Sequence, residues 1–558
     1  MTLESFIPPR SKIVMEVTGD VPADFETTKE KFLEVQPECT YMIAKDISKF
    51  GKKLDAIVLQ NELIGNMEHD ELVELIKKSA GRLAPRGTLI FALDNIAFVE
   101  NVMAILEGLP PKMKTTLTKT QLEDAIDEAG LNKLRSMNAS RRMQIPQELA
   151  EISKVNPAVF AFIITATPDE VPPKTLIQTA IGERLVCAPV RIHTPNVFMV
   201  TEPNVMAISV DSGNTYELFS KENYENRIFI NQRISFPSFR KGADFFREMR
   251  KRDYLFLEEM DDNPTLWKDK YEQTAWINFV GAHGVQTSTE YLAEFFRQFN
   301  PNVRVFANHL RRILPPRDFD EEFQNSERPV TIFFGALNRD EEFISLLPVL
   351  NKFAKEYGNK IAFKIIARQK LFDALESDNK IFVGNPNYYD GQLAPYNQYE
   401  EALRTSDIAL LPLADNEFNR AKSDLKFIEC AGCGAVALAS PVVYESTIKD
   451  GETGFIFRDE RDFAFKLKIL IDNREKRRSV AEAAYKYVKR NRLLSQHYEE
   501  RLDWYRELLA RLPELHEETQ ARIDKIAVNF KDEPPPEIKN ESPVEGNLGP
   551  NAEIIIPV

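Results

Sequence analysis

The sequence predicts an α/β protein built from three Rossmann-like domains. Short apolar runs bounded by turn residues alternate with amphipathic segments along most of the chain, a pattern typical of parallel sheets covered by helices. The chain has 558 residues, too many for a single hydrophobic core. A proline-containing stretch at 171–173 separates the first block of elements from the second. We therefore expect ligands at the carboxyl ends of the strands.

Composition and charge exclude several classes of protein. The formal net charge of −14 argues against a general nucleic-acid binder, because affinity for the phosphate backbone comes from clustered Lys and Arg. No apolar run reaches the roughly 20 residues that span a bilayer, and the N-terminus lacks a secretory pattern. We expect a cytoplasmic protein. Cys430 and Cys433 form a lone C-x-x-C, and without a second pair we expect no zinc.

The first block, residues 1–168, alternates predicted strands and helices. The predicted strands are 12–17, 54–60, 88–93 and 159–165, and the predicted helices are 70–83 and 121–129. The stretch from Asp55 through LAPRGTLIFALDN resembles class I methyltransferases that use S-adenosylmethionine. A Gly-rich turn should follow the first strand of such a domain, but residues 17–22 contain one glycine and a proline. We interpret the domain as degenerate, structural or acceptor-binding, with methyl transfer as the alternative.

The second block follows a predicted linker at 169–184 and covers residues 185–325. Its predicted strands are 186–192, 227–231, 254–257, 284–287 and 303–307, with helices at 239–251 and 289–296. Three residues flank these strands and are candidates for catalysis: His193 after the first strand, Asp262 beside Asp261 after a middle strand, and His283 before a later one. A structural role, as a hydrogen-bonded histidine or a capping carboxylate, is the alternative for each.

The third block, residues 326–475, begins with a predicted strand at 330–334. Gly335 follows this strand in a turn that could approach phosphates, and Arg339 could clamp them. Further strands are predicted at 361–366, 381–384 and 407–413. Beyond the block, residues 476–530 have a helical pattern, and residues 531–558 are Pro-rich and predicted to be a flexible tail.

The stretch 418–440 carries the densest chemical pattern. It predicts a loop, a helix capped by Ser423 or Asp424, a glycine turn and a buried strand. Lys422, Lys426 and Glu429 are spaced four and three residues apart, so they could share one helix face. Two lysines at a helix start suit a diphosphate, and a carboxylate one turn further suits sugar hydroxyls. A solvated face with a salt bridge is the alternative.

These motifs resemble the donor half of group 1 glycosyltransferases of the GT-B type, over about residues 330–504. The matching segments are DIALLPL, FNRAKSDLKFIECAGCGAVALAS and GETGFI. The resemblance implies that Glu429 holds the nucleotide ribose and that the nucleobase lies near Asn385. The family pattern has a second glutamate at the position of Ala421. Asn419, Glu417 or Asp415 could replace it near the donor sugar. The block at 185–325 resembles the acceptor half, with looser motifs.

The resemblance implies a hexosyltransferase that uses a nucleotide-diphosphate sugar as co-substrate, with retention at the anomeric carbon and no metal or other cofactor. The expected acceptor is a glycan, a lipid-linked molecule or a protein, in bacterial surface polysaccharide or glycoconjugate synthesis; peripheral membrane association is compatible with this. The predicted architecture is GT-B, two facing Rossmann-like domains with helices 476–530 packed across them, preceded by the methyltransferase-like domain. A methyltransferase and a non-catalytic scaffold are the alternatives.

Overall fold

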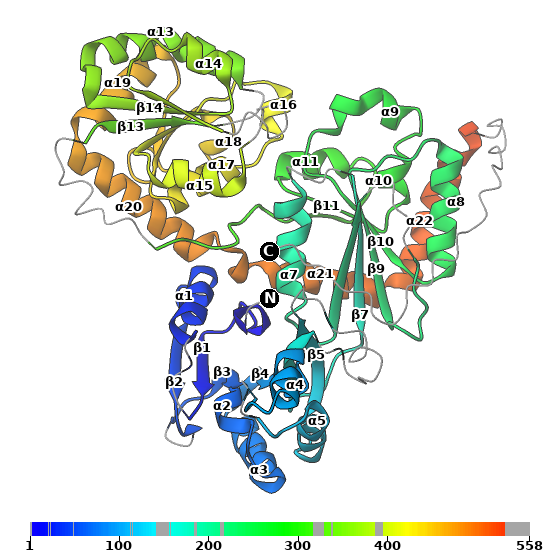
Figure 1. Cartoon of the computed structure of the whole chain (residues 1–558). Coiled ribbons are helices and arrows are strands. Elements are labelled where there is room, and N and C mark those ends of the chain that lie inside the picture. Colours follow the sequence, from blue (N-terminus) through cyan, green and yellow to red (C-terminus); the bar gives the residue numbers. More distant parts are fainter. Residues whose placement is uncertain are drawn as a thin grey trace.

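Three six-stranded sheets form the protein (Figure 1). The computed structural model describes residues 3–19, 22, 24–47, 50–111, 113, 115–140, 145, 156, 158–182, 187–211, 217–315, 328–335, 339–384 and 394–530. Each sheet belongs to one block of the sequence, and helices cover its faces. No helix in these ranges is both long enough and apolar enough to cross a membrane.

The first sheet has the order β2-β1-β3-β4-β6-β5. Its strands are Thr40–Ala44 (β2), Ile13–Val17 (β1), Leu54–Leu59 (β3), Leu83–Asp94 (β4), Val159–Thr167 (β6) and Asn132–Ser140 (β5). The first four are parallel, and β6 is antiparallel to both β4 and β5. Helices α1 (Phe25–Val35), α2 (Asn61–Ile64), α3 (His69–Ala80), α4 (Val99–Leu106) and α5 (Lys119–Glu128) complete the domain. A methyltransferase-like character stays a prediction.

The second sheet has the order β12-β11-β10-β9-β7-β8 and is parallel throughout. Its strands are Val303–Val305 (β12), Gly284–Thr287 (β11), Leu255–Glu259 (β10), Asn226–Gln232 (β9), Thr175–Ile181 (β7) and Val205–Asp211 (β8). Helices α7 (Thr194–Met199), α8 (Phe239–Lys251), α9 (Lys268–Glu272), α10 (Ile277–Gly281) and α11 (Glu290–Phe296) surround it, with the short helix η4 (Pro264–Trp267) before α9.

Two predictions for the start of this domain are wrong. The strand β7 lies inside the predicted linker at 169–184, and the predicted strand 186–192 runs into a π-helical turn, η3 (Pro189–His193), that continues into α7. Pro189 occupies the first turn of η3, where a missing N–H leaves no helical bond unmade. A short buried apolar run is compatible with either a strand or a helix, so the pattern alone does not separate them.

The third sheet has the order β15-β14-β13-β16-β17-β18 and is also parallel. Its strands are Lys380–Val383 (β15), Ile361–Ile366 (β14), Val330–Phe334 (β13), Ile408–Leu411 (β16), Val436–Ala439 (β17) and Phe455–Ile456 (β18). The helices of this half are α13 (Asp340–Tyr357), α14 (Gln369–Ala374), α15 (Tyr396–Arg404), α16 (Glu417–Arg420), α17 (Leu425–Gly432), α18 (Pro441–Tyr444) and α19 (Glu460–Asp472). These positions agree with the predicted strands.

The C-terminal helices connect the second and third domains (Figure 1). Helix α20 (Arg474–Asn491) packs on α17 and shares the core of the third domain through Ala484, Tyr485 and Val488. Helix α21 (Tyr498–Ala510) joins the core of the second domain, and α22 (Leu512–Ala527) packs on α8 and α10. One continuous segment therefore holds both halves. The predicted tail at 531–558 lies outside the described residues.

A buried carboxylate attaches the first domain to the rest. Glu202, after α7, accepts hydrogen bonds from Arg10 at 2.9 Å, Arg86 at 2.9 Å and the Tyr498 hydroxyl at 2.6 Å. Arg10 and Arg86 belong to the first domain, and Tyr498 belongs to α21. Although burial opposes ionisation, these partners hold the pKa of Glu202 below its usual value. The first domain is thus docked through charge-assisted hydrogen bonds rather than by a linker alone.

Candidate functional site

The candidate site lies where the turn before α17 meets the second domain. Lys422 is in this turn, between the end of α16 at Arg420 and the start of α17 at Leu425. The predicted common helix face for Lys422 and Lys426 is therefore wrong. Asp424 occupies the N-cap position of α17, in line with the prediction, but its side chain makes no capping hydrogen bond. Its carboxylate binds the guanidinium of Arg492 in a two-point contact and accepts from Thr447.

Two cations gather around one aromatic ring at this turn. The Lys422 ammonium lies 4.1 Å from the centroid of the Phe418 ring, and the Arg339 guanidinium lies 5.6 Å from it. Burial lowers the pKa of Lys422, and the nearby charges of Arg339 and Arg233 lower it further, while Asp262 acts in the opposite direction. Like charges brought together in a partly buried place favour binding of an anion.

A buried carboxylate follows these cations on α17. Glu429 is 7% exposed, and its Oε2 accepts from the Tyr399 hydroxyl at 2.9 Å and from the Lys426 ammonium at 3.0 Å. Lys426 also donates to the Tyr399 oxygen at 2.9 Å. Burial raises the pKa of Tyr399, and the Glu429 charge raises it further. Only one of the two Glu429 oxygens is held in this way, so the other can accept from a ligand.

Ala421, where the family pattern has its second glutamate, is packed in the interior of the second domain. Ala421 is fully buried in a cluster with Met260, Tyr271, Phe279, Val285, Leu292 and Phe296, all from that domain. A short chain segment of the third domain thus inserts its methyl group into the neighbouring core. A glutamate side chain would have to displace aromatic rings here.

Asn419 lies two residues before Ala421 and is 1% exposed. Its amide nitrogen donates to Ala414 at 2.8 Å and to Glu342 at 3.2 Å. Its Oδ1 has no hydrogen-bond partner in the described part of the chain. An unpaired buried acceptor is costly, and a sugar hydroxyl could satisfy it. Of the other proposed substitutes, Asp415 pairs with Arg420 at 2.6 Å, and Glu417 begins α16.

An ion pair joins the two halves. The Lys422 ammonium donates to Asp262 Oδ1 of the second domain at 2.7 Å. Arg233 lies on the other side of this carboxylate, 3.4 Å from Asp262 Oδ2, and its Nε donates to Asp261 at 2.8 Å. The structure therefore brings the predicted catalytic carboxylate Asp262 next to the predicted diphosphate ligand Lys422.

A second contact between the halves fixes their approach beside this pair. Buried Arg191 donates to Glu259 at 2.7 Å, to Asn308 at 2.9 Å and to the carbonyl of Thr287 at 3.0 Å. These acceptors follow or end strands β10 to β12. Asn308 in turn donates to Ser423 of the third domain at 2.8 Å. The turn that carries Lys422 is thus positioned by the carboxyl ends of the second sheet.

The remaining donor-site residues have different positions. Gly335 follows β13, where a Cβ atom would lie 2.6 Å from the Phe333 ring and 3.1 Å from Ile366. Packing therefore requires a glycine at this position. Arg339 is 9% exposed and directly precedes α13. Asn385 lies outside the described residues, so its contact with a nucleobase stays a prediction.

One of the two candidate histidines, His283, lies at the other end of the second sheet from Asp262. His283 precedes β11, at the amino end of the sheet, opposite the end that binds ligands. Its Nδ1 accepts from the backbone of Phe256 at 2.8 Å, and its Nε2 lies 3.0 Å from His516 Nδ1. This position does not support a catalytic role for His283, which contacts α22 through His516. His193 ends η3 rather than a strand, and its part in the reaction stays a prediction.

The sequence analysis assigns no site role to Arg233 or Tyr399. Arg233 follows β9 with a φ of 57°, a backbone conformation that is uncommon outside glycine and often marks a functional position. Its position directly after a strand could have marked Arg233 as a candidate, because ligands bind at the carboxyl ends of parallel strands. The contact of Tyr399 with Glu429 joins helices α15 and α17, which no spacing in the sequence reveals.

One family model matches part of the third block and the helices that follow it. Residues 359–507 match the family model described as glycosyl transferase-like. The matched residues include Lys422, Lys426 and Glu429. The second and third domains are each built on a parallel six-stranded sheet, as the predicted GT-B architecture of two Rossmann-like halves requires. Among curated proteins, no relative was found.

Three of the solved structures that are similar to the chain are described here. A glycosyltransferase from Rickettsia africae is 13% identical, with 60% of this chain and 99% of that chain covered and a TM-score of 0.43. HepE from Anabaena, solved with UDP and glucose, is 10% identical, with 59% and 98% covered and a TM-score of 0.42. A mutant of TarM from S. aureus is 12% identical, with 89% and 99% covered and a TM-score of 0.37.

Proposed function

We propose that this protein is a glycosyltransferase that moves a hexose-type sugar from a nucleotide-diphosphate donor to an acceptor hydroxyl. The observation that supports this most is the arrangement at the start of α17. The charged groups of Lys422 and Arg339 both contact the Phe418 ring. One to two turns further along the chain, Tyr399 and Lys426 hold the Glu429 carboxylate through hydrogen bonds. Cations followed by a fixed carboxylate match a diphosphate followed by a ribose.

In this proposal the protein's own cations stabilise the leaving group. Lys422, Arg339 and the first N–H groups of α17 would neutralise the diphosphate as the glycosidic bond breaks, so no metal would be required. The free oxygen of Glu429 would accept from the ribose hydroxyls. Asn419 Oδ1, which lacks a partner within the described ranges, would accept from a hydroxyl of the donor sugar. Retention at the anomeric carbon is part of the proposal.

Donor binding would also release the second domain's carboxylate. Asp262 is paired with Lys422 at 2.7 Å, and a diphosphate carries more negative charge than one carboxylate. We expect the diphosphate to take over Lys422, which would leave Asp262 with Arg233 and available to accept the proton of the acceptor hydroxyl. The ion pair would therefore couple donor binding to acceptor activation. We place the reaction in the cytoplasm, in synthesis of a bacterial surface glycan.

The test is release of free nucleoside diphosphate by the full-length protein from a panel of nucleotide sugars. We expect release with one donor, a strong loss in Glu429→Gln, and normal release in Glu401→Gln, an exposed glutamate on α15 with only an Arg404 contact at 3.3 Å. If no donor is cleaved, with or without added glycan acceptors, and none raises the melting temperature, the proposal is wrong.

One observation favours a second candidate, a non-catalytic scaffold that retains the fold. Ala421 stands where the family pattern has a glutamate, and it is buried in the core of the second domain. A scaffold would bind a nucleotide sugar or glycan without turnover. Saturable binding of a donor with no release of diphosphate at high enzyme concentration would favour this candidate over the transferase.

A further inference from the structure

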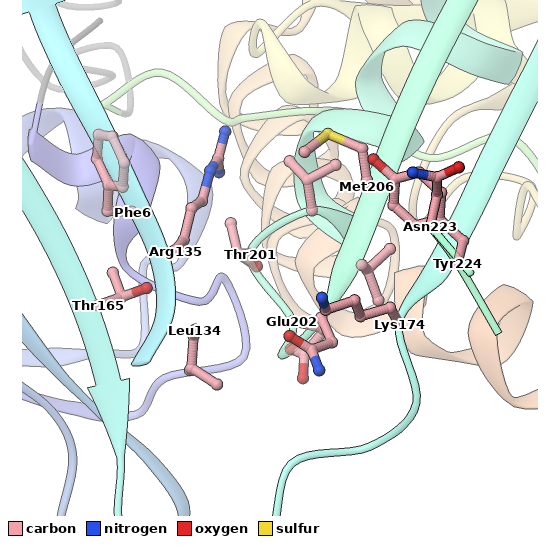
Figure 2. Close-up of a pocket in the computed structure, with 13 residues that line it drawn as sticks. Phe6, Leu134, Arg135, Thr165, Lys174, Thr201, Glu202, Met206, Asn223 and Tyr224 are labelled. Atoms are coloured by element: carbon pink, nitrogen blue, oxygen red, sulfur yellow. The ribbon is translucent and has the colours of Figure 1, made fainter. Parts of the chain in front are cut away.

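A cavity lies between the first and second domains, and no residue of α17 lines it (Figure 2). Its volume is ≈ 250 Å³, far above the roughly 10–15 Å³ that a single water molecule needs. Figure 2 shows two facing walls: Phe6, Leu134, Arg135 and Thr165 from the first domain, and Lys174, Met206, Asn223 and Tyr224 from the second. The cavity therefore exists only when the two domains are docked.

The charges that line this cavity are predominantly positive. Glu202 borders it, but Arg10, Arg86 and Tyr498 already neutralise its carboxylate. Arg135, on the edge strand β5, has its guanidinium carbon 5.4 Å from the centroid of the Phe6 ring and forms no ion pair within the described ranges. Burial lowers the pKa of Arg135, and no acid opposes that effect. A half-buried guanidinium without an acidic partner is a costly arrangement unless a ligand completes it.

Two more polar groups at this cavity lack partners. The backbone N–H of Lys174 binds Glu225 at 2.8 Å, while its side-chain ammonium is exposed and has no acid within the described ranges. The Tyr224 hydroxyl also makes no hydrogen bond in the part of the chain that the structure describes, and burial raises the pKa of Tyr224. Apolar side chains, including Leu134 and Met206, form much of the rest of the lining. A few polar groups on a largely apolar wall are typical of a small-molecule site.

We propose that this cavity binds a small organic anion, a sugar-sized molecule that carries one phosphate or carboxylate group. Arg135 and Lys174 hold the anionic group with charge-assisted hydrogen bonds. Phe6 and the apolar lining contact the remainder, and the volume excludes a folded protein or an extended chain. Because the walls come from two domains, the ligand binds only the docked arrangement and stabilises it.

The test is calorimetric titration of the full-length protein with four probes: glucose 6-phosphate, glucuronate, neutral glucose and inorganic phosphate. We expect saturable binding of glucose 6-phosphate or glucuronate, at least tenfold weaker binding of glucose, and a rise in melting temperature with the binding probe. The affinity should fall at least tenfold in Arg135→Gln and fall clearly in Lys174→Gln. Arg135→Lys keeps the charge and should recover part of the affinity.

Matched controls separate this site from the others. Lys133→Gln removes a cation from the same strand that is paired with Asp127 at 2.9 Å, and it should bind the probe as the wild type does. Lys422→Gln should also bind normally, which distinguishes this cavity from the proposed donor site. Three results would overturn the proposal: no saturable binding of either organic anion, equal affinity in the wild type and in both glutamine variants, or equal affinity for inorganic phosphate and the organic anions.

Discussion

Replacing Glu429 by glutamine is the sharpest test of the proposed donor site, because the change is nearly isosteric. The carboxylate is 7% exposed and accepts from Tyr399 and Lys426 through one oxygen. Hydrogen bonds to a charged acceptor are each worth about 1.5–3 kcal/mol. Loss of the charge beneath the ribose should therefore weaken donor binding about tenfold to a hundredfold.

The same substitution should change the stability of the fold little. The Lys426 side chain is 35% exposed, so solvent screens its ion pair with Glu429, and the loss should stay below about 1 kcal/mol. Donor affinity would be measured by titration and by the KM for diphosphate release, and stability by urea unfolding. Glu401→Gln serves as the matched control. Unchanged donor affinity in a folded Glu429→Gln variant would refute the assignment of this carboxylate to the nucleotide.

Three further predictions concern the contact between the halves and a buried carboxyl group. Ala421→Glu should lower the free energy of unfolding by about 3 kcal/mol or more, because a charge enters an aromatic cluster; Arg420→Ala, at an exposed neighbour, should change it by less than about 0.5 kcal/mol, and equal urea midpoints for the two variants would contradict the packing. A double-mutant cycle of Lys422→Met and Asp262→Asn should give a coupling of about 0.5–2 kcal/mol in unfolding experiments without donor, and a coupling of zero would show that the pair contributes nothing. Burial raises the pKa of Glu258 well above 4.5, so the native state keeps a proton that the unfolded chain releases, and stability should fall as pH rises from about 4.5 through the raised pKa; Glu258→Gln should remove that slope, and parallel stability curves for the variant and the wild type between pH 4.5 and 8 would contradict the assignment.

Local pattern was sufficient for most elements of the second and third domains. The predicted strands 330–334, 361–366 and 284–287 and the helix 239–251 coincide with β13, β14, β11 and α8. The spacing of apolar residues and the turn residues at each end predict these elements directly, because each is a buried run with a clear boundary. The strand β7 was missed, since prolines precede it and suggested a linker, and the apolar run after it was assigned to a strand although it is helical.

The chain by itself determined the α/β class, the order of the three blocks and the gathering of Lys422, Lys426 and Glu429 near one helix start. These features depend on residues close together in the sequence. Tertiary structure alone decided that Lys422 meets Asp262, which lies 160 residues away, that Ala421 enters the neighbouring core, and that His283 lies at the non-binding end of its sheet. Such contacts join separately folded domains, and no local periodicity records which surfaces two domains will bury against each other.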